Sequence, residues 1–191
     1  GRSSHTPDAF ARVFNYLLPV ILYAAAVVIW GTTPMLKHFF SLEPSILNQQ
    51  PFPYSVARVH DLGAISILKG YGIFFYGYTD KPLYMVFLAL LHGIAGNNYN
   101  LLSWLQICVL AFTPVILFQF GKKFYSSLFG TVLAALVILQ QRNAIVLSYK
   151  VASANPKLLI TEGLTLLGMA LISYLLFVWM EKKGSKTILL I

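Results

Sequence analysis

Long apolar stretches are the feature that most constrains this chain. Segments of about 20 apolar residues recur from Phe14 to the C-terminus, and about 20 residues is the length at which a helix crosses the hydrocarbon of a bilayer. Only 10% of the 191 residues are charged and 58% are hydrophobic, whereas a soluble domain has roughly 25% charged residues. Membrane-spanning strands would instead show short alternating segments. The sequence therefore predicts an all-α integral membrane protein with several transmembrane helices.

The expected organisation alternates membrane helices with two extracytoplasmic loops. We expect a cytoplasmic tail at 1–12, transmembrane helices at 13–33, 101–120, 126–141 and 158–180, and extracytoplasmic loops at 34–100 and 142–157. Pro114 predicts a kink in the second of these helices. Residues 187–191 resemble the start of a further transmembrane helix, so we expect the chain to be a truncated part of a longer protein.

The apolar run at 82–96 decides the topology. Its 15 residues at about 1.5 Å each reach roughly 22 Å, which is short of the roughly 30 Å hydrocarbon core. If the run does not span, the basic clusters at Lys122–Lys123 and Lys182–Lys183 face the cytoplasm together with the N-terminus, as the positive-inside tendency favours. We therefore expect 82–96 to be a juxtamembrane helix within a long extracytoplasmic first loop.

This topology gathers most of the acidic residues on the extracytoplasmic side. Four of the six lie there: Glu43, Asp61, Asp80 and Glu162. A local explanation exists for three of them. Asp61 suits a solvated helix start, Asp80 suits a cap before Pro82, and Glu162 suits an ion pair with Lys157 or Arg142. The functional alternative is a general base and its neighbours beside a lipid-borne substrate. The residues alone leave both interpretations open.

The net charge of +8 is typical of loops anchored to anionic lipid headgroups. A run of basic residues with interleaved aromatics, which would indicate nucleic-acid binding, is missing from the sequence. We therefore expect membrane lipid, and no nucleic acid, among the partners.

The order of several motifs resembles a known family. A first helix is followed by a long loop with Asp61, then by "TDKPLYMVFLALLHGIAG", by a helix ending in "GKKFYSSLFG", and by "ITEGLTLLGMALISYLLF". This order resembles the N-terminal part of the polyprenol-phosphate-dependent glycosyltransferases of the GT-C class. The resemblance is greatest to the branch with the protein O-mannosyltransferases and the lipid A aminoarabinose transferase.

The resemblance implies transfer of a sugar from a polyprenyl-phosphate carrier to a protein or lipid acceptor on the extracytoplasmic face of the plasma, inner or endoplasmic reticulum membrane. It implies catalytic roles for Asp61, Asp80 and Glu162, with Asp61 as the base or the acceptor-orienting group. It also implies that the lipid phosphate is bound by basic residues: Lys81, Arg58, Arg142 and Lys150. No cofactor is firmly implied, and a divalent metal ion is left open.

The alternative is a non-catalytic GT-C-like membrane subunit or scaffold of a larger complex. The truncated length and Leu62 favour it, because the family often has Glu where this chain has Leu62. Leu83, where the family has a second Pro, is a further departure from the family pattern. The acid-Lys-Pro motif at Asp80–Pro82 and the four acids on the extracytoplasmic side favour the enzyme. Other membrane subunits would then be additional partners of the enzyme.

Overall fold

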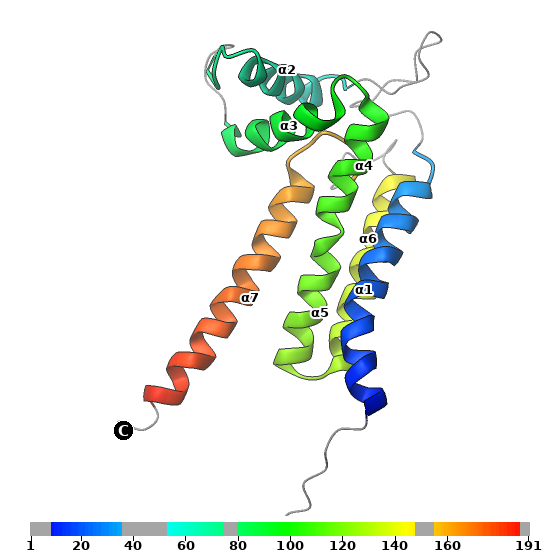
Figure 1. Cartoon of the computed structure of the whole chain (residues 1–191), viewed down its shortest axis with the longest axis vertical. Helices are drawn as coiled ribbons and strands as arrows, with labels where there is room; N and C mark the ends of the chain where they lie inside the picture. Colours follow the sequence, from blue (N-terminus) through cyan, green and yellow to red (C-terminus); the bar gives the residue numbers. More distant parts are fainter. Residues whose placement is uncertain (1–8, 36–52, 75–79, 148–154, 188–191) are drawn as a thin grey trace, which may run out of the picture.

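The computed structural model describes residues 9–35, 53–74, 80–147 and 155–187 (Figure 1). This part of the chain is all-helical and has no strand. Its helices are α1 (Ala9–Thr32), α2 (Val56–Leu68), α3 (Pro82–Ala95), α4 (Tyr99–Leu110), α5 (Phe112–Phe124), α6 (Ser127–Val146) and α7 (Glu162–Thr187). The predicted all-α class is confirmed at this level.

Four long rods run side by side: α1, α4 continued by α5, α6, and α7 (Figure 1). α1 packs on α5 and α6, while α7 packs on α5 and on the lower part of α4. α4 ends at Leu110 and α5 begins at Phe112. The ring of Pro114 would clash with the carbonyl four residues earlier, that of Leu110, and this explains the interruption there. The sequence predicted a kink at Pro114, and the structure interrupts the rod at Ala111, three residues before it.

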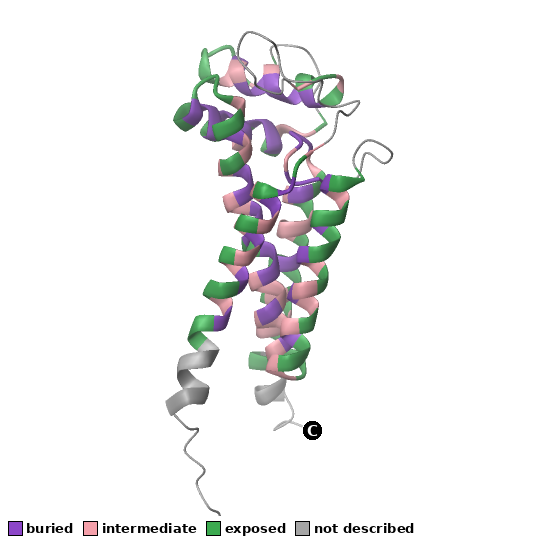
Figure 2. Ribbon diagram, turned by 90° about the vertical axis from the view of Figure 1, so that its right-hand side faces the viewer, coloured by how far each residue is buried: buried purple, intermediate pink, exposed green. Residues whose placement is uncertain are grey.

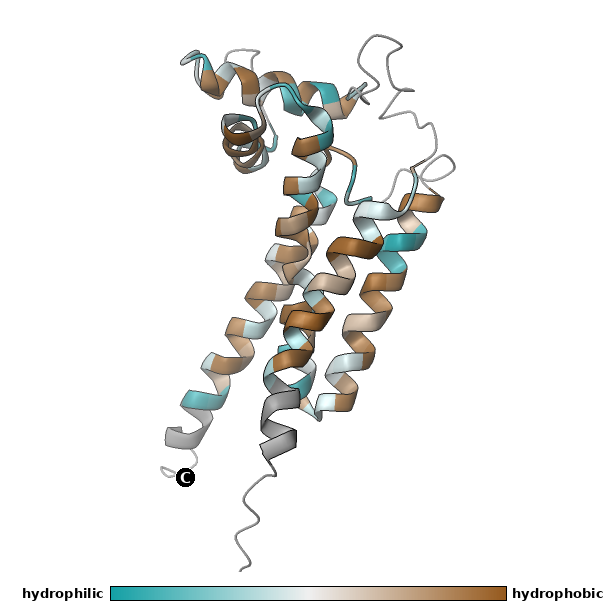
Figure 3. Cartoon of the chain, turned by 45° about the vertical axis from the view of Figure 1, so that its right-hand side comes forward, coloured by the Kyte–Doolittle hydropathy of each residue, from teal (hydrophilic) through white to brown (hydrophobic). Residues whose placement is uncertain are grey.

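Three apolar helical stretches of the described chain are long enough to cross a membrane: Tyr99–Phe124, Ser127–Val146 and Glu162–Lys182. Hydrophobic residues follow these rods along most of their length (Figure 3). The apolar stretches Tyr16–Thr32 and Pro82–Ala95 are shorter. The first of them belongs to α1, and the second is α3.

α7 exposes most of its apolar surface. Only 11% of its most apolar stretch is buried, and Ile172, Leu176 and Trp179 are among its exposed residues. Exposed residues recur along the long helical rods (Figure 2). Soluble monomers rarely expose a contiguous apolar face of this kind. The exposure suits a helix surrounded by lipid or by other membrane helices.

Glycines allow α5 and α6 to approach closely. A Cβ on Gly130 would lie 2.3 Å from the backbone oxygen of Phe118, and one on Gly121 would lie 2.6 Å from the Cα of Gly130. Ser126 begins α6 by accepting a hydrogen bond from the backbone N–H of Phe129 at 3.2 Å. Small residues at such crossings are typical of helix packing in membranes.

α2 and α3 lie across one end of the rods, at the end opposite the N-terminus of α1 (Figure 1). α2 packs on α3, and α3 packs on α4. Their buried apolar residues form a core of their own with Leu102 of α4 and with Leu158–Ile160. The basic Lys122, Lys123 and Lys182 belong to the other end, where α5 meets α6 and where α7 finishes.

Several helix bounds differ from those expected from sequence: α1 begins at Ala9, the rod of α4 and α5 runs from Tyr99 to Phe124, and α7 continues to Thr187. α6 continues to Val146 beyond the expected 141, since no Gly or Pro interrupts "QQRNAIV". α7 begins at Glu162 and not at 158. The intervening Leu158, Leu159 and Ile160 are buried in a non-helical segment beneath α2 and α3. Gln106 holds this segment, as described below.

Candidate functional site

Asp61 lies at the centre of a hydrogen-bonded cluster that joins three helices. It is on α2 and is only 3% exposed. Its Oδ1 accepts a hydrogen bond from Nε2 of His92 on α3 at 2.7 Å. Its Oδ2 accepts one from the hydroxyl of Tyr99, the first residue of α4, at 2.8 Å. Both carboxylate oxygens therefore have a protein donor, and the acid is inside the molecule and not on its surface.

His92 sits between two acceptors. Its Nδ1 lies 2.7 Å from the backbone oxygen of Gly96, and its Nε2 lies 2.7 Å from Asp61. An imidazole donates at both nitrogens only when it is doubly protonated. Burial lowers the pKa of His92, but the hydrogen bonds to Asp61 and to the Gly96 carbonyl, together with the Asp61 charge, outweigh it and raise the pKa overall. Both ring nitrogens therefore face an acceptor, as a protonated His92 paired with Asp61 requires.

The turn after α3 presents the Gly96 carbonyl to His92. Gly96 ends the helix with φ +57, a backbone conformation that glycine adopts readily. Asn98 then begins α4 by accepting a hydrogen bond from the backbone N–H of Leu101 at 3.0 Å. This short turn places Tyr99 beside Asp61, and the Tyr99 ring meets the His92 ring edge to face at 5.9 Å.

His60, on α2, is the second buried histidine at this end of the molecule. It is 2% exposed, its ring meets that of Tyr84 edge to face at 5.3 Å, and its Nδ1 lies 3.5 Å from the backbone oxygen of Leu159. Burial lowers the pKa of His60, and the Leu159 carbonyl only partly opposes this shift. We therefore treat His60 as a neutral ring at neutral pH.

Three charged residues lie within electrostatic range of His60: Asp80, Lys81 and Glu162. The charge of Lys81 lowers the pKa of His60 further, beyond the larger effect of burial, and the two acids oppose it. Asp80 and Glu162 are exposed and Lys81 is half-buried. Glu162 is the first residue of α7, at the same end as α2 and α3 (Figure 1). This end of the molecule thus combines exposed acids with a cation.

Asp80 does not cap α3, contrary to the local explanation given for it from sequence. The residue that caps α3 is Lys81, and no side-chain capping hydrogen bond is formed there. Pro82 does occupy the first turn, as expected. Asp80 therefore lies one residue before the cap, and capping does not account for it.

The other predicted basic residues are distributed over this end. Arg58 is exposed on α2 and acts electrostatically on Tyr99. Arg142 is exposed on the last turns of α6. Lys150 and Glu43 lie outside the described residues.

Lys157 is used inside the fold. Its Nζ donates to the backbone oxygens of Gly31, at 2.8 Å, and of Thr33. These carbonyls are at the C-terminus of α1, where helices leave acceptors without an intrahelical partner. Burial lowers the pKa of Lys157. An ion pair with Lys157 was one local explanation for Glu162, but the Lys157 ammonium instead donates to the end of α1.

Gln106 of α4 holds the segment that leads into α7. Its Nε2 donates to the backbone oxygens of Pro156, at 2.9 Å, and of Leu158, at 2.7 Å. Its Oε1 accepts from the Tyr84 hydroxyl at 3.1 Å. Burial raises the pKa of Tyr84 well above its ordinary value, with the charges of Glu162 and Asp61 adding to the effect. The phenol therefore stays protonated and able to donate.

Three residues of this end were not singled out from sequence: His92, Tyr99 and Gln106. His92 and Gln106 are polar side chains within otherwise apolar helices, which is the signal that could have found them. Within the ranges the structure describes, no three His, Cys, Asp or Glu side chains are grouped closely enough to share a metal ion.

Comparisons with protein-family models, with curated proteins and with solved structures found no match to this chain.

Proposed function

We propose that this chain is part of a multi-pass membrane glycosyltransferase that uses a polyprenyl-phosphate sugar as donor. The site would lie at the end that carries α2 and α3, on the extracytoplasmic side of the membrane. The observation that carries the proposal is that Asp80, Lys81 and Glu162 all lie at that end, within electrostatic range of His60. The three apolar rods that lead to this end support a membrane setting.

The proposed roles follow from charge and, for the two acids, from exposure. Lys81 would contact the lipid phosphate, because a leaving phosphate gains negative charge as the sugar C1–O bond breaks. The acceptor hydroxyl would attack C1 and lose its proton to Asp80 or Glu162, which are the exposed acids. The products are the glycosylated acceptor and the free polyprenyl phosphate. Arg58, Arg142 and Lys150 would extend the cationic surface for the carrier.

In this proposal Asp61 is not the base or acceptor-orienting group that the family resemblance implies. Its oxygens are occupied by His92 and Tyr99, so we assign it to positioning α2 against α3 and α4. Its substitution would then act on transfer through the fold of this end and not through proton transfer.

The test is sugar transfer from a labelled polyprenyl-phosphate donor by the full-length native protein in membranes. Glu162→Gln and Asp80→Asn are compared with Glu181→Gln. Glu181 is on the same helix as Glu162 and pairs with Lys123 at 2.6 Å at the far end of the bundle. We expect one of the first two variants to lose transfer by about 100-fold, which is typical for a general base, while Glu181→Gln keeps it. Equal activity of all three would refute the roles of these acids.

A non-catalytic membrane subunit is the second candidate. The saturation of Asp61 and the use of Lys157 at the end of α1 favour it, since both charges then serve the fold. The open apolar face of α7 would pack against helices of a partner. Absence of transfer in the native protein, together with its copurification with other membrane subunits in mild detergent, would favour this candidate.

A further inference from the structure

Gln141 presents a buried polar atom without a protein partner. It lies on α6 and is 4% exposed. Its Oε1 accepts no hydrogen bond from any residue that the structure describes, and no other buried side-chain nitrogen or oxygen in those ranges shares this state. Leaving a buried acceptor without a donor is costly, particularly in the apolar interior of a bundle. This position therefore needs a donor other than the side chains that the structure describes.

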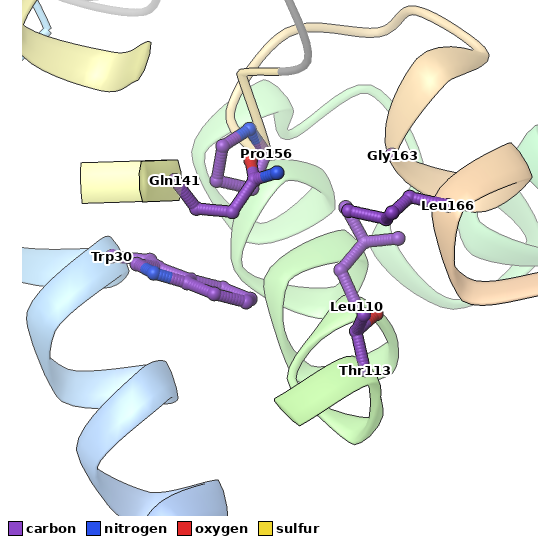
Figure 4. Close-up of a pocket in the computed structure, with 7 residues that line it drawn as sticks. All are labelled: Trp30, Leu110, Thr113, Gln141, Pro156, Gly163 and Leu166. Carbon is purple, nitrogen blue, oxygen red and sulfur yellow. The ribbon is translucent and has the colours of Figure 1, made fainter. Parts of the chain in front are cut away.

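The Gln141 amide points toward a small pocket where the long rods meet (Figure 4). Its wall includes Trp30 of α1, Thr113 of α5, Gly163 of α7 and Pro156, which precedes α7. The indole N–H of Trp30 is already donated to the backbone oxygen of Ile138 at 3.0 Å. The hydroxyl of Thr113 is the other polar side-chain group of the lining.

The size of the pocket limits its occupant. A Cβ on Gly163 would lie 2.7 Å from Cδ1 of Leu110, so this wall is closed by direct packing. The space between the lining side chains holds about one water molecule. Apart from Gln141 and Thr113, the wall consists of apolar side chains and glycine.

The chemistry of the amide also favours water. A water molecule both donates and accepts, so it satisfies whichever amide atom faces the pocket. Buried waters typically have two to four polar partners, and the polar side chains that line this pocket are those of Gln141 and Thr113. We propose that this pocket binds one long-lived internal water molecule, which links α6 to α5 beside the first turn of α7.

The proposal is tested on the whole chain in detergent micelles by NMR. The side-chain amide protons of Gln141 should show a cross-peak to water with the sign of a long-lived complex. Gln140, which is exposed on the same helix, is the internal control and should show only the weak transfer of surface water. Thr113→Val, which removes the second partner, should weaken the Gln141 cross-peak and leave Gln140 unchanged. A missing cross-peak at Gln141, or one to lipid or detergent protons instead, would overturn the proposal.

Thermal unfolding of Gln141→Met gives an independent measurement. Met has a similar shape and needs no hydrogen bond. If water satisfies the amide, the unfolding temperature of Gln141→Met should not exceed that of Gln140→Met. If the acceptor is without any donor, Gln141→Met should unfold at a clearly higher temperature than this control, which would also overturn the proposal.

Discussion

His92 and Asp61 form a buried ion pair in which Nε2 and Oδ1 are 2.7 Å apart. The pair connects α3 to α2, and the Tyr99 hydroxyl on the other carboxylate oxygen connects both to α4. A buried pair of this kind does little for stability compared with apolar packing, but removal of one partner leaves an uncompensated charge. The cluster therefore fixes how α2 and α3 sit on the end of the bundle.

The first prediction concerns the loss of one partner. Asp61→Leu should lower the free energy of unfolding by about 3–5 kcal/mol, because it leaves the His92 imidazolium buried and unpaired. Chemical unfolding in detergent, followed by circular dichroism, measures the change. Asp80→Leu is the control, since Asp80 is exposed, and should alter the same quantity by less than about 0.5 kcal/mol. Equal effects of the two substitutions would contradict a buried ion pair.

The second prediction concerns pH. The pKa of His92 is raised in the fold above its ordinary value of 6.5, so the folded state binds the proton more tightly than the unfolded chain. Its contribution to stability is complete below pH 6.5 and is lost as the pH rises through the folded pKa. The unfolding midpoint of the native chain should therefore fall over this range.

His92→Gln is the matched variant for the pH experiment, because Gln cannot titrate. It should remove this alkaline loss of stability. His60 works in the opposite direction: its pKa is lowered by burial, so its protonation below pH 6.5 destabilises the fold. An alkaline loss in His92→Gln as large as that of the native chain would show that another group causes it.

The third prediction concerns the contact of α5 with α6. Gly130→Ala should destabilise the chain, because the added Cβ would meet the Phe118 carbonyl oxygen at 2.3 Å, and a backbone atom cannot move aside cheaply. Gly168→Ala on α7 is the control, as its Cβ would meet nothing within 4 Å. The control should be neutral or more stable by up to about 1 kcal/mol, because Ala favours the helix. Thermal unfolding of both variants checks this: the unfolding temperature should fall for Gly130→Ala and should stay the same or rise for Gly168→Ala.

The fourth prediction concerns Gln106. Gln106→Leu removes three hydrogen bonds and leaves the Tyr84 hydroxyl and the carbonyls of Pro156 and Leu158 without this partner. Each buried group that is left without a hydrogen-bond partner lowers the free energy of unfolding by about 1–3 kcal/mol. The start of α7 should become more open to amide hydrogen exchange, which mass spectrometry can follow. Protection at Glu162–Thr165 unchanged from the native chain would contradict the role of Gln106.

Periodicity and breakers predicted the elements of the bundle better than their ends. The helical rods follow from apolar length, and the interruption near Pro114 follows from proline geometry. The start of α7 at Glu162 could not be predicted, because Gln106, about fifty residues earlier, binds the segment before it. Local rules also assigned Asp80 to a cap, whereas the chain uses Lys81.

The burial of Asp61 and its contact with His92 could not be predicted from sequence patterns either, because they also depend on tertiary packing. The length of 82–96 argued for a helix outside the membrane core, but not for the face on which it would pack. That packing on α2 is what turns His92 toward Asp61. The expectation of an exposed general base at Asp61 depended on the order of motifs, which contains no information on burial.

The most direct test of the proposed function is the transfer of a labelled sugar from a polyprenyl-phosphate donor by the full-length protein carrying Lys81→Gln. Lys69→Gln is the control, because Lys69 is an exposed lysine that follows α2 at the same end of the molecule. If Lys81 contacts the lipid phosphate, its loss should reduce transfer by about 10- to 100-fold, as expected for a hydrogen bond to a charged group, while Lys69→Gln transfers at the native rate. Native-level transfer by Lys81→Gln would contradict the proposed site.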